Sequence, residues 1–115
     1  MKQYTNTEQT AKLIELGFER PKSMAEYDLP AGDWRIGAKG LRPAYSIGEL
    51  ISILPKELEK HSWDFYSIDI YFDTFNWNVC YKNRKGQIAY QTSSIEELVN
   101  ALFEMGVKLK EEGVI

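Results

Sequence analysis

The feature that most constrains the fold is a period-two pattern of large apolar residues at positions 65–72. Side chains of a strand alternate between the two faces of its sheet, so this spacing is typical of a strand with one buried face. Two short loops and two further apolar stretches follow it. The pattern therefore predicts a three-stranded antiparallel meander with strands at about 65–72, 77–82 and 87–92. The apolar members of the first strand are Tyr66, Ile68, Ile70 and Phe72.

The two loops predict the register of the meander. Each is four residues long, at 73–76 and 83–86, and the second ends in Gly86, where a left-handed backbone is often needed. One face is then apolar across all three strands, and a one-residue slip would break it. The pairs predicted in this way are Phe72–Trp77, Ile70–Val79, Lys82–Gln87 and Tyr81–Ile88.

Three helices are predicted from capping boxes, in which a Ser or Thr is followed three residues later by Glu. The boxes are Thr5–Glu8, Ser46–Glu49 and Ser94–Glu97. The helices then span about 6–16, 47–54 and 95–112. Gly106 is unfavourable inside the last helix, and a close approach of that helix to the sheet would explain it. We therefore predict a single α+β domain over 1–115, with the helices packed on one face of the meander.

The segment at about 19–45 is predicted to be irregular, because three prolines and three glycines interrupt it. A connection this long in a small domain is often functional or ordered by packing. Within it, Asp33 to Ile36 could add a short edge strand. The stretch 56–61, before the meander, reads as a polar connection.

Composition narrows the class of protein. The chain has 115 residues, 43% of them hydrophobic, and a formal net charge of −3, which argues against non-specific binding to nucleic acid. A lone cysteine, Cys80, excludes an internal disulfide and fits a reducing compartment. The polar start of the chain has no apolar signal region, and no apolar run reaches the ~20 residues that a membrane helix needs. We expect a cytoplasmic protein that does not bind membranes.

No residue set points to catalysis. Cys80 and His61 are single residues of their kinds, and nothing in the sequence places the imidazole beside the thiol. Asp69 and Asp73 lie on one strand, and four residues at ~3.3 Å each separate them by ~13 Å, too far for paired catalytic carboxylates. We therefore expect a non-enzymatic protein with no cofactor and no metal ion.

Four segments carry a resemblance: QTAKLIELGF, YSIGELISILP, NWNVCY and SSIEELVNALFEMGVKLKEEGVI. In this order they resemble a type of small uncharacterised protein encoded by bacteriophages, prophages and other mobile elements of bacteria. The shared motifs are structural: a helix ending in LGF, a capped helix ending in LP, and a strand that contains tryptophan. The resemblance covers most of the chain outside 19–43. It implies a phage-related accessory protein and brings no activity, cofactor or site residue with it.

Two modes of nucleic-acid binding can be compared with the sequence. Double-stranded-RNA-binding domains place basic residues at the start of their last helix, where this chain has Glu96 and Glu97. An aromatic residue among basic residues could grip a single strand, as the loop 34–42 would with its basic and aromatic side chains. This loop is the alternative to protein binding, and Arg84 with Lys85 offers a similar site. The loop residues concerned are Trp34, Arg35, Lys39 and Arg42.

The face of the meander opposite the predicted helices is the expected interaction surface. It is mixed in polarity and more apolar than a solvent-exposed face usually is. Either the segment 19–45 covers it, with Trp34 as the plug, or another chain does, and the second chain could be another protein or a second copy. The candidate surface residues are Trp34, Phe65, Tyr71, Asn78, Cys80 and Gln91.

Overall fold

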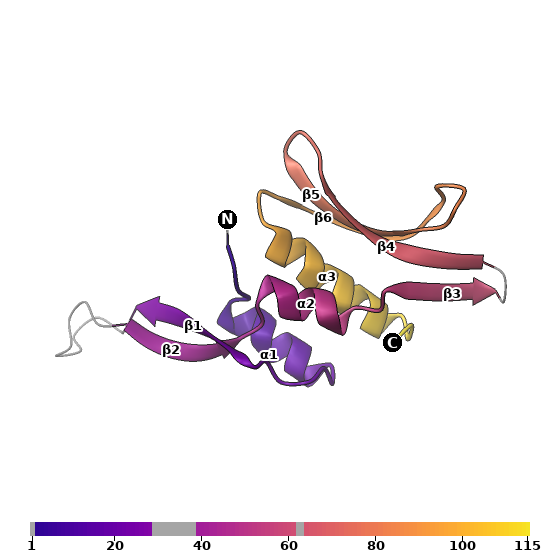
Figure 1. The fold of residues 1–115 in the computed structure, drawn as a ribbon. Coiled ribbons are helices and arrows are strands. Elements are labelled where there is room, and N and C mark those ends of the chain that lie inside the picture. The colour runs from indigo at the N-terminus through magenta and orange to yellow at the C-terminus, as the bar shows by residue number, and fades with distance from the viewer. Residues whose placement is uncertain (1, 29–38, 62–63) are drawn as a thin grey trace.

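A computed structural model describes residues 2–28, 39–61 and 64–115 (Figure 1). The chain is an α+β domain, as predicted. Its elements in chain order are α1 (Thr7–Glu15), β1 (Ser23–Asp28), β2 (Lys39–Ala44), α2 (Ile47–Ile53), β3 (Glu57–His61), β4 (Asp64–Phe72), β5 (Asn76–Lys82), β6 (Ile88–Ile95) and α3 (Leu98–Glu111).

The central element is a four-stranded antiparallel sheet with the strand order β3-β4-β5-β6. The first predicted hairpin is correct in register, because Phe72 pairs with Trp77 and Ile70 pairs with Val79. The predicted apolar face is also correct at its centre, where Val79 and Tyr81 are completely buried. The polar connection predicted at 56–61 is wrong, since Glu57–His61 forms the edge strand β3 and pairs with β4.

The second hairpin differs from its predicted register by two residues. Tyr81 pairs with Tyr90 rather than with Ile88, which is 45% exposed. One residue of the shift comes from a longer loop, since Lys82 pairs with Ile88, and the other comes from a bulge between Tyr81 and Lys82. From Tyr90 onwards the shift is even, so Tyr90, Gln91 and Thr92 keep their predicted faces of the sheet, whereas Ile88, shifted by one residue, lies on the face of Lys82.

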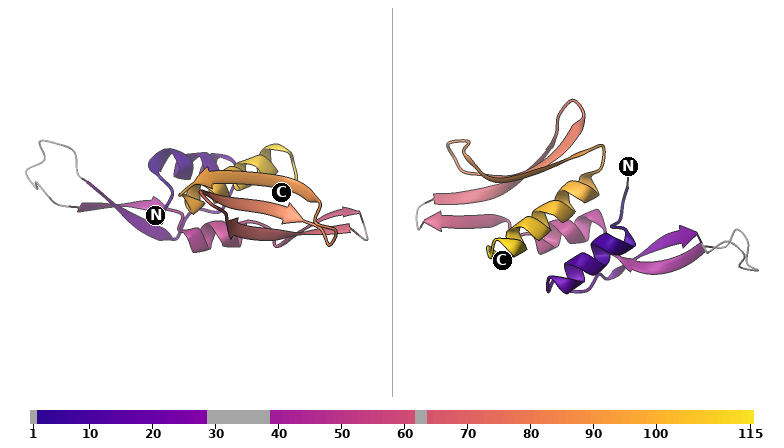
Figure 2. Two further views of the ribbon diagram at one scale, coloured as in Figure 1. Left: turned by 90° about the horizontal axis from the view of Figure 1, so that it is seen from above. Right: turned by 180° about the vertical axis from the view of Figure 1, so that it is seen from behind.

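The segment 19–45 is not irregular throughout. Its described residues form the hairpin β1–β2, in which Ser23 pairs with Ala44 and Asp28 with Lys39. This hairpin lies beside α1, away from the four-stranded sheet (Figures 1 and 2). The extra strand proposed at Asp33 to Ile36 lies outside the described residues.

The helices confirm some of the capping predictions. Ser46 and Glu49 form the predicted box at α2. At α1 the box is Asn6–Gln9, because Thr5 is fully buried and its hydroxyl accepts a 3.0 Å hydrogen bond from the Tyr45 N–H. The third box does not form: Ser94 continues β6, and α3 begins at Leu98 without a side-chain cap.

Helix ends behave as local sequence predicts. Gly17 follows α1 with a φ of +96°, and the Phe18 N–H bonds back to the Leu13 carbonyl at 3.1 Å. Gly113 follows α3 with a φ of +72°, and Val114 bonds back to Leu109 in the same way at 2.9 Å.

The packing has three layers rather than one sheet covered by three helices. Helix α3 lies directly against β5 and β6, and α1 and α2 pack on α3 (Figure 1). Gly106 therefore does not face the sheet: a Cβ there would lie 3.7 Å from Leu13 and Phe18 and 3.9 Å from Leu54. The core is formed by these layers, with Leu13, Tyr45, Leu50, Val79, Tyr81, Leu102, Met105 and Leu109 at its centre.

The four-stranded sheet is strongly bent. Its hairpins curve away from α3, so that the face opposite α3 is concave (Figure 1). The radius of gyration is 16.5 Å, compared with ~13 Å for a compact chain of this length, because β1–β2 and the β3–β4 end extend in opposite directions (Figure 2). The bend gives the sheet a concave face opposite α3, and the two projecting hairpins extend the molecule on either side.

Candidate interaction surface

The outer face, opposite α3, brings together five of the six candidate residues. Phe65 and Tyr71 lie on β4, Asn78 and Cys80 on β5, and Gln91 on β6, all with side chains on this face. The sixth, Trp34, lies outside the described residues. The described part of 19–45 forms the β1–β2 hairpin and does not cover this face (Figure 1). We define the outer face by the residues Phe65, Ser67, Asp69, Tyr71, Asn78, Cys80, Lys82, Gln91 and Ser93.

Lys82 organises the middle of the outer face. Its ammonium lies 3.4 Å from the Asp69 carboxylate and 5.0 Å from the centre of the Tyr71 ring. Cys80 pairs with Asp69 in the ladder, between the pairs Lys82–Ser67 and Asn78–Tyr71. It is completely buried although it faces away from α3. Sequence reasoning assigned no role to Lys82 because its partners are on the neighbouring strand.

The Cys80 thiol is not placed for nucleophilic chemistry. Burial raises its pKa, Asp69 raises it further, and Lys82 lowers it. His61 is at the end of β3 and pairs with Asp64, which is five residues, roughly 16 Å, along β4 from the partner of Cys80. The structure therefore does not bring these two residues together, and a catalytic Cys–His pair is not supported.

Asn78 is a buried polar residue, and both its amide nitrogen and its amide oxygen form hydrogen bonds. Its Nδ2 donates to the Asp73 carboxylate at 3.0 Å, and its Oδ1 accepts from the Ser93 hydroxyl at 2.6 Å and from Gln91 at 3.4 Å. Asp73 also accepts from the Asn76 N–H at 3.1 Å. Asp73 therefore closes the β4–β5 turn, and Asp69 is paired with Lys82, so each of the two carboxylates has a structural partner.

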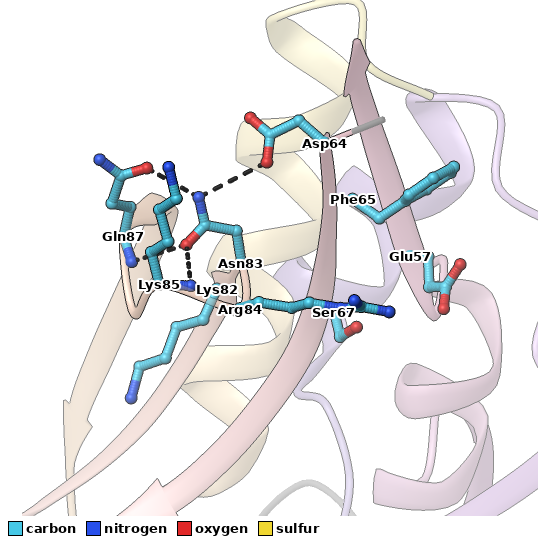
Figure 3. Close-up of a pocket in the computed structure, with 9 residues that line it drawn as sticks. All are labelled: Glu57, Asp64, Phe65, Ser67, Lys82, Asn83, Arg84, Lys85 and Gln87. Atoms are coloured by element: carbon cyan, nitrogen blue, oxygen red, sulfur yellow. Dashed lines mark hydrogen bonds between the residues drawn. The ribbon is translucent and has the colours of Figure 1, made fainter. Parts of the chain in front are cut away.

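A cavity of about 710 Å³ opens at one end of the outer face, where the β5–β6 loop faces β3 and β4 (Figure 3). Asn83 shapes the loop: its Oδ1 accepts from the Lys85 and Gln87 N–H groups at 3.0 and 2.9 Å. Phe65 supplies an aromatic wall and is 46% exposed. The lining residues are Glu57, Asp64, Phe65, Ser67, Lys82, Asn83, Arg84, Lys85 and Gln87.

Of the basic residues proposed for nucleic-acid binding, the side chains that the structure describes, Arg42, Arg84 and Lys85, lie on two different parts of the molecule. Arg42 is turned into the protein, where its Nη2 donates to the Thr5 carbonyl at 2.8 Å and its Nη1 is buried. Arg84 and Lys85 lie on a different part of the molecule, at the cavity beside the acidic Glu57 and Asp64. Trp34 and Arg35 lie outside the described residues.

The described residues contain no cluster of three or more His, Cys, Asp or Glu side chains able to hold a metal ion. None of the helices in this part of the chain is long and apolar enough to cross a membrane. The comparisons with known proteins add no candidate, since no family model, curated protein or solved structure matches the chain.

Proposed function

We propose that this chain is a non-enzymatic accessory protein that binds another protein through its outer face. The observation that carries the proposal is the exposed Phe65 beside the 710 Å³ cavity on a concave face. A concave surface with an aromatic wall and a few fixed polar groups is typical of a binding site.

The chemistry of the outer face indicates the kind of contact. Phe65 offers apolar area, and Gln91 is an exposed polar residue. Charges of both signs surround the cavity, from Glu57, Asp64, Arg84 and Lys85. A phosphate backbone would meet repulsion from the two acids. A protein loop or extended segment with mixed polarity would find a partner for each group, which favours a protein as the ligand.

We propose a non-enzymatic role because the side chains that could act in catalysis, Cys80, Asp69 and Asp73, have structural interactions instead. Cys80 is completely buried, Asp69 is paired with Lys82, and Asp73 closes a turn. These interactions stabilise the fold and leave the candidate groups with structural roles. The setting, a phage or mobile-element protein in the bacterial cytoplasm, rests on the resemblance of the four sequence segments.

The test is affinity capture from bacterial lysate, run with and without nuclease, followed by mass spectrometry. The wild-type chain is compared with Phe65→Asp and Tyr71→Asp, which place a carboxylate on the outer face. Ile51→Asp is the matched control, because Ile51 is 40% exposed on α2, outside this face. We expect one protein to be enriched by the wild type and by the control, and lost with both outer-face variants.

The outcomes separate the alternatives. A protein that is captured equally by all four chains would contradict the outer face as the contact surface. Capture that disappears with nuclease would instead support the basic and aromatic loop 34–42, and this binding should then weaken steeply with salt. In that case Trp34→Ala would lower the binding and Tyr71→Asp would not.

A further inference from the structure

The two edges of the four-stranded sheet are built differently. Strand β3 is five residues long and has the charged sequence ELEKH, features that discourage pairing with another strand. Strand β6 is eight residues long, and its sequence IAYQTSSI contains no charge, proline or glycine. The bulge in its ladder lies near its start, at Ala89, and the pairing from Tyr90 to Ile95 is regular. Among the described strands, β6 pairs with β5 alone (Figure 2). A long, uncharged edge of this kind is a template for strand addition.

The backbone groups available on β6 can be deduced from the ladder. The Glu96 N–H donates to the Phe75 carbonyl at 3.3 Å, in continuity with the pairs Trp77–Ser94 and Val79–Thr92. In an antiparallel ladder the hydrogen-bonded pairs alternate, so these residues direct their N–H and C=O groups towards β5. The intervening residues direct theirs outwards. The outward residues are Gln91, Ser93 and Ile95, and all three are exposed.

The charges at the two ends of β6 are opposite in sign, and this favours a second copy of β6 in antiparallel orientation as the pairing strand. The strand follows a basic loop with Arg84 and Lys85 and precedes the acidic Glu96 and Glu97. In an antiparallel pair of identical strands, the start of one strand lies beside the end of the other. The basic loop of each copy would therefore approach the acids of its partner, twice in one dimer, whereas a parallel pair would place like charges together.

We propose that two copies of this chain associate through antiparallel pairing of their β6 strands, which forms a continuous eight-stranded sheet. A two-fold axis perpendicular to the sheet keeps both α3 helices on one side and both outer faces on the other. Because α3 lies under β5 and β6, the two α3 helices become neighbours beneath the joined edge. This inference concerns the β6 edge and does not rest on the proposed function.

The oligomeric state of the full chain tests the proposal directly. We expect sedimentation equilibrium to give twice the 13.3 kDa chain mass at concentrations up to about 100 μM, where weak interfaces are occupied. Ser93→Pro should give a monomer, since proline removes an outward N–H and leaves the backbone hydrogen bonds to β5 intact. It also removes the Ser93 hydroxyl that donates to Asn78 at 2.6 Å, so Ser93→Ala, which removes only the hydroxyl, should remain a dimer. The matched proline control is Glu57→Pro, on the opposite edge, and this variant should remain a dimer. Circular dichroism verifies that all three variants are folded.

The position of Glu57 makes the control a fair one. The Ile68 N–H donates to the Lys56 carbonyl at 3.0 Å, so by the same alternation the Glu57 N–H points away from β4. Both prolines therefore remove an outward donor from an edge strand. A monomeric wild-type chain over the whole concentration range would overturn the proposal, and so would a Ser93→Pro chain that stays dimeric.

Charge reversal distinguishes the antiparallel arrangement from other dimers. Arg84→Glu with Lys85→Glu places acids beside acids and should weaken the dimer at least tenfold. Adding Glu96→Lys to the same chain restores opposite charges across the interface and should recover most of this loss. No recovery would contradict the antiparallel pairing. The capture experiment has a separate readout, so the dimer and the outer-face partner can fail independently.

Discussion

The Tyr81 hydroxyl donates a 2.7 Å hydrogen bond to the carbonyl of Pro55. The bond joins β5, at the centre of the sheet, to the chain just after α2, and Tyr81 is completely buried. Pro55 prevents α2 from continuing beyond Ile53. Its own carbonyl therefore lies outside the helix and has no helical N–H to accept from. A single tyrosine therefore fills the core and also supplies the partner for that carbonyl.

Tyr81→Phe should lower the free energy of unfolding by about 1–2 kcal/mol, because it leaves the Pro55 carbonyl without its donor. Urea unfolding followed by circular dichroism measures the loss. Tyr66→Phe is the control, since the described residues supply no hydrogen-bond partner for the Tyr66 hydroxyl. Equal losses in the two variants would show that the hydrogen bond contributes nothing beyond ring packing.

Stability should fall in alkaline solution. Burial raises the pKa of Tyr81, and burial with the nearby Glu49 raises the pKa of Tyr45. The unfolded chain loses these phenol protons at about pH 10, before the native state does. The stabilisation is thus complete below pH 10 and is lost as the pH rises through the native pKa values, by up to about 1.4 kcal/mol per pH unit for each group.

Unfolding measured between pH 8 and pH 11.5 tests this dependence. Tyr81→Phe should flatten the curve above pH 10, because one of the groups with a raised pKa is gone. A wild-type curve that stays level between pH 10 and pH 11.5 would show that these phenols are not held neutral in the native state.

Gly106→Ala should stabilise the protein by about 0.5–1 kcal/mol, because alanine is favoured inside a helix. The new Cβ would lie at ordinary contact distances of 3.7 Å from Leu13 and Phe18. Gly17→Ala is the contrasting variant and should destabilise, because Gly17 has a φ of +96°. Thermal unfolding measures both. If Gly106→Ala were destabilised, the added methyl group would be pushing α3 away from α1 at a cost greater than the gain in helix propensity.

Asn78→Ala should cost about 1–3 kcal/mol, since it removes the partner of the Asp73 carboxylate and of the Ser93 hydroxyl at a buried site. Gln91→Ala is the control, because its bond to Asn78 is long, at 3.4 Å, and its side chain is exposed. We expect the control to change the urea midpoint little. A similar midpoint for both variants would argue that the Asn78 network adds no stability.

Cys80 should react with a thiol reagent only when the protein opens. The thiol is completely buried and its pKa is raised by burial, so both access and thiolate formation are opposed. We expect the native rate with an aromatic disulfide reagent to be roughly a thousandfold or more below that of the denatured chain. Rapid reaction of the native protein would show that the Cys80 thiol is accessible in the folded state.

Local sequence determined much of this fold. The box of Ser46 and Glu49, the glycines that end α1 and α3, and the Phe72–Trp77 hairpin all depend on residues within a few positions of one another. Such interactions are complete within one turn or one loop, so the residue types alone specify them. The α+β class follows from the same patterns.

Side-chain parity explains why the face of β6 was predicted correctly although its register was not. A two-residue shift returns a side chain to the same face, so from Tyr90 onwards the apolar pattern is the same in both registers. The choice was made by the bulge between Tyr81 and Lys82 and by the loop that Asn83 organises. The outer-face residues were predicted from parity for the same reason.

Tertiary structure alone decided the features that depend on distant segments. The β1–β2 hairpin and strand β3 have charged or interrupted sequences, and they are strands because a neighbouring strand satisfies their backbone groups. Gly106 faces Leu13, Phe18 and Leu54, far away in the sequence. Cys80 is completely buried on the outer face, and Lys82 contacts Asp69 and Tyr71 of the neighbouring strand. These outcomes depend on which surfaces meet, and a local pattern holds no information about its partner across the fold.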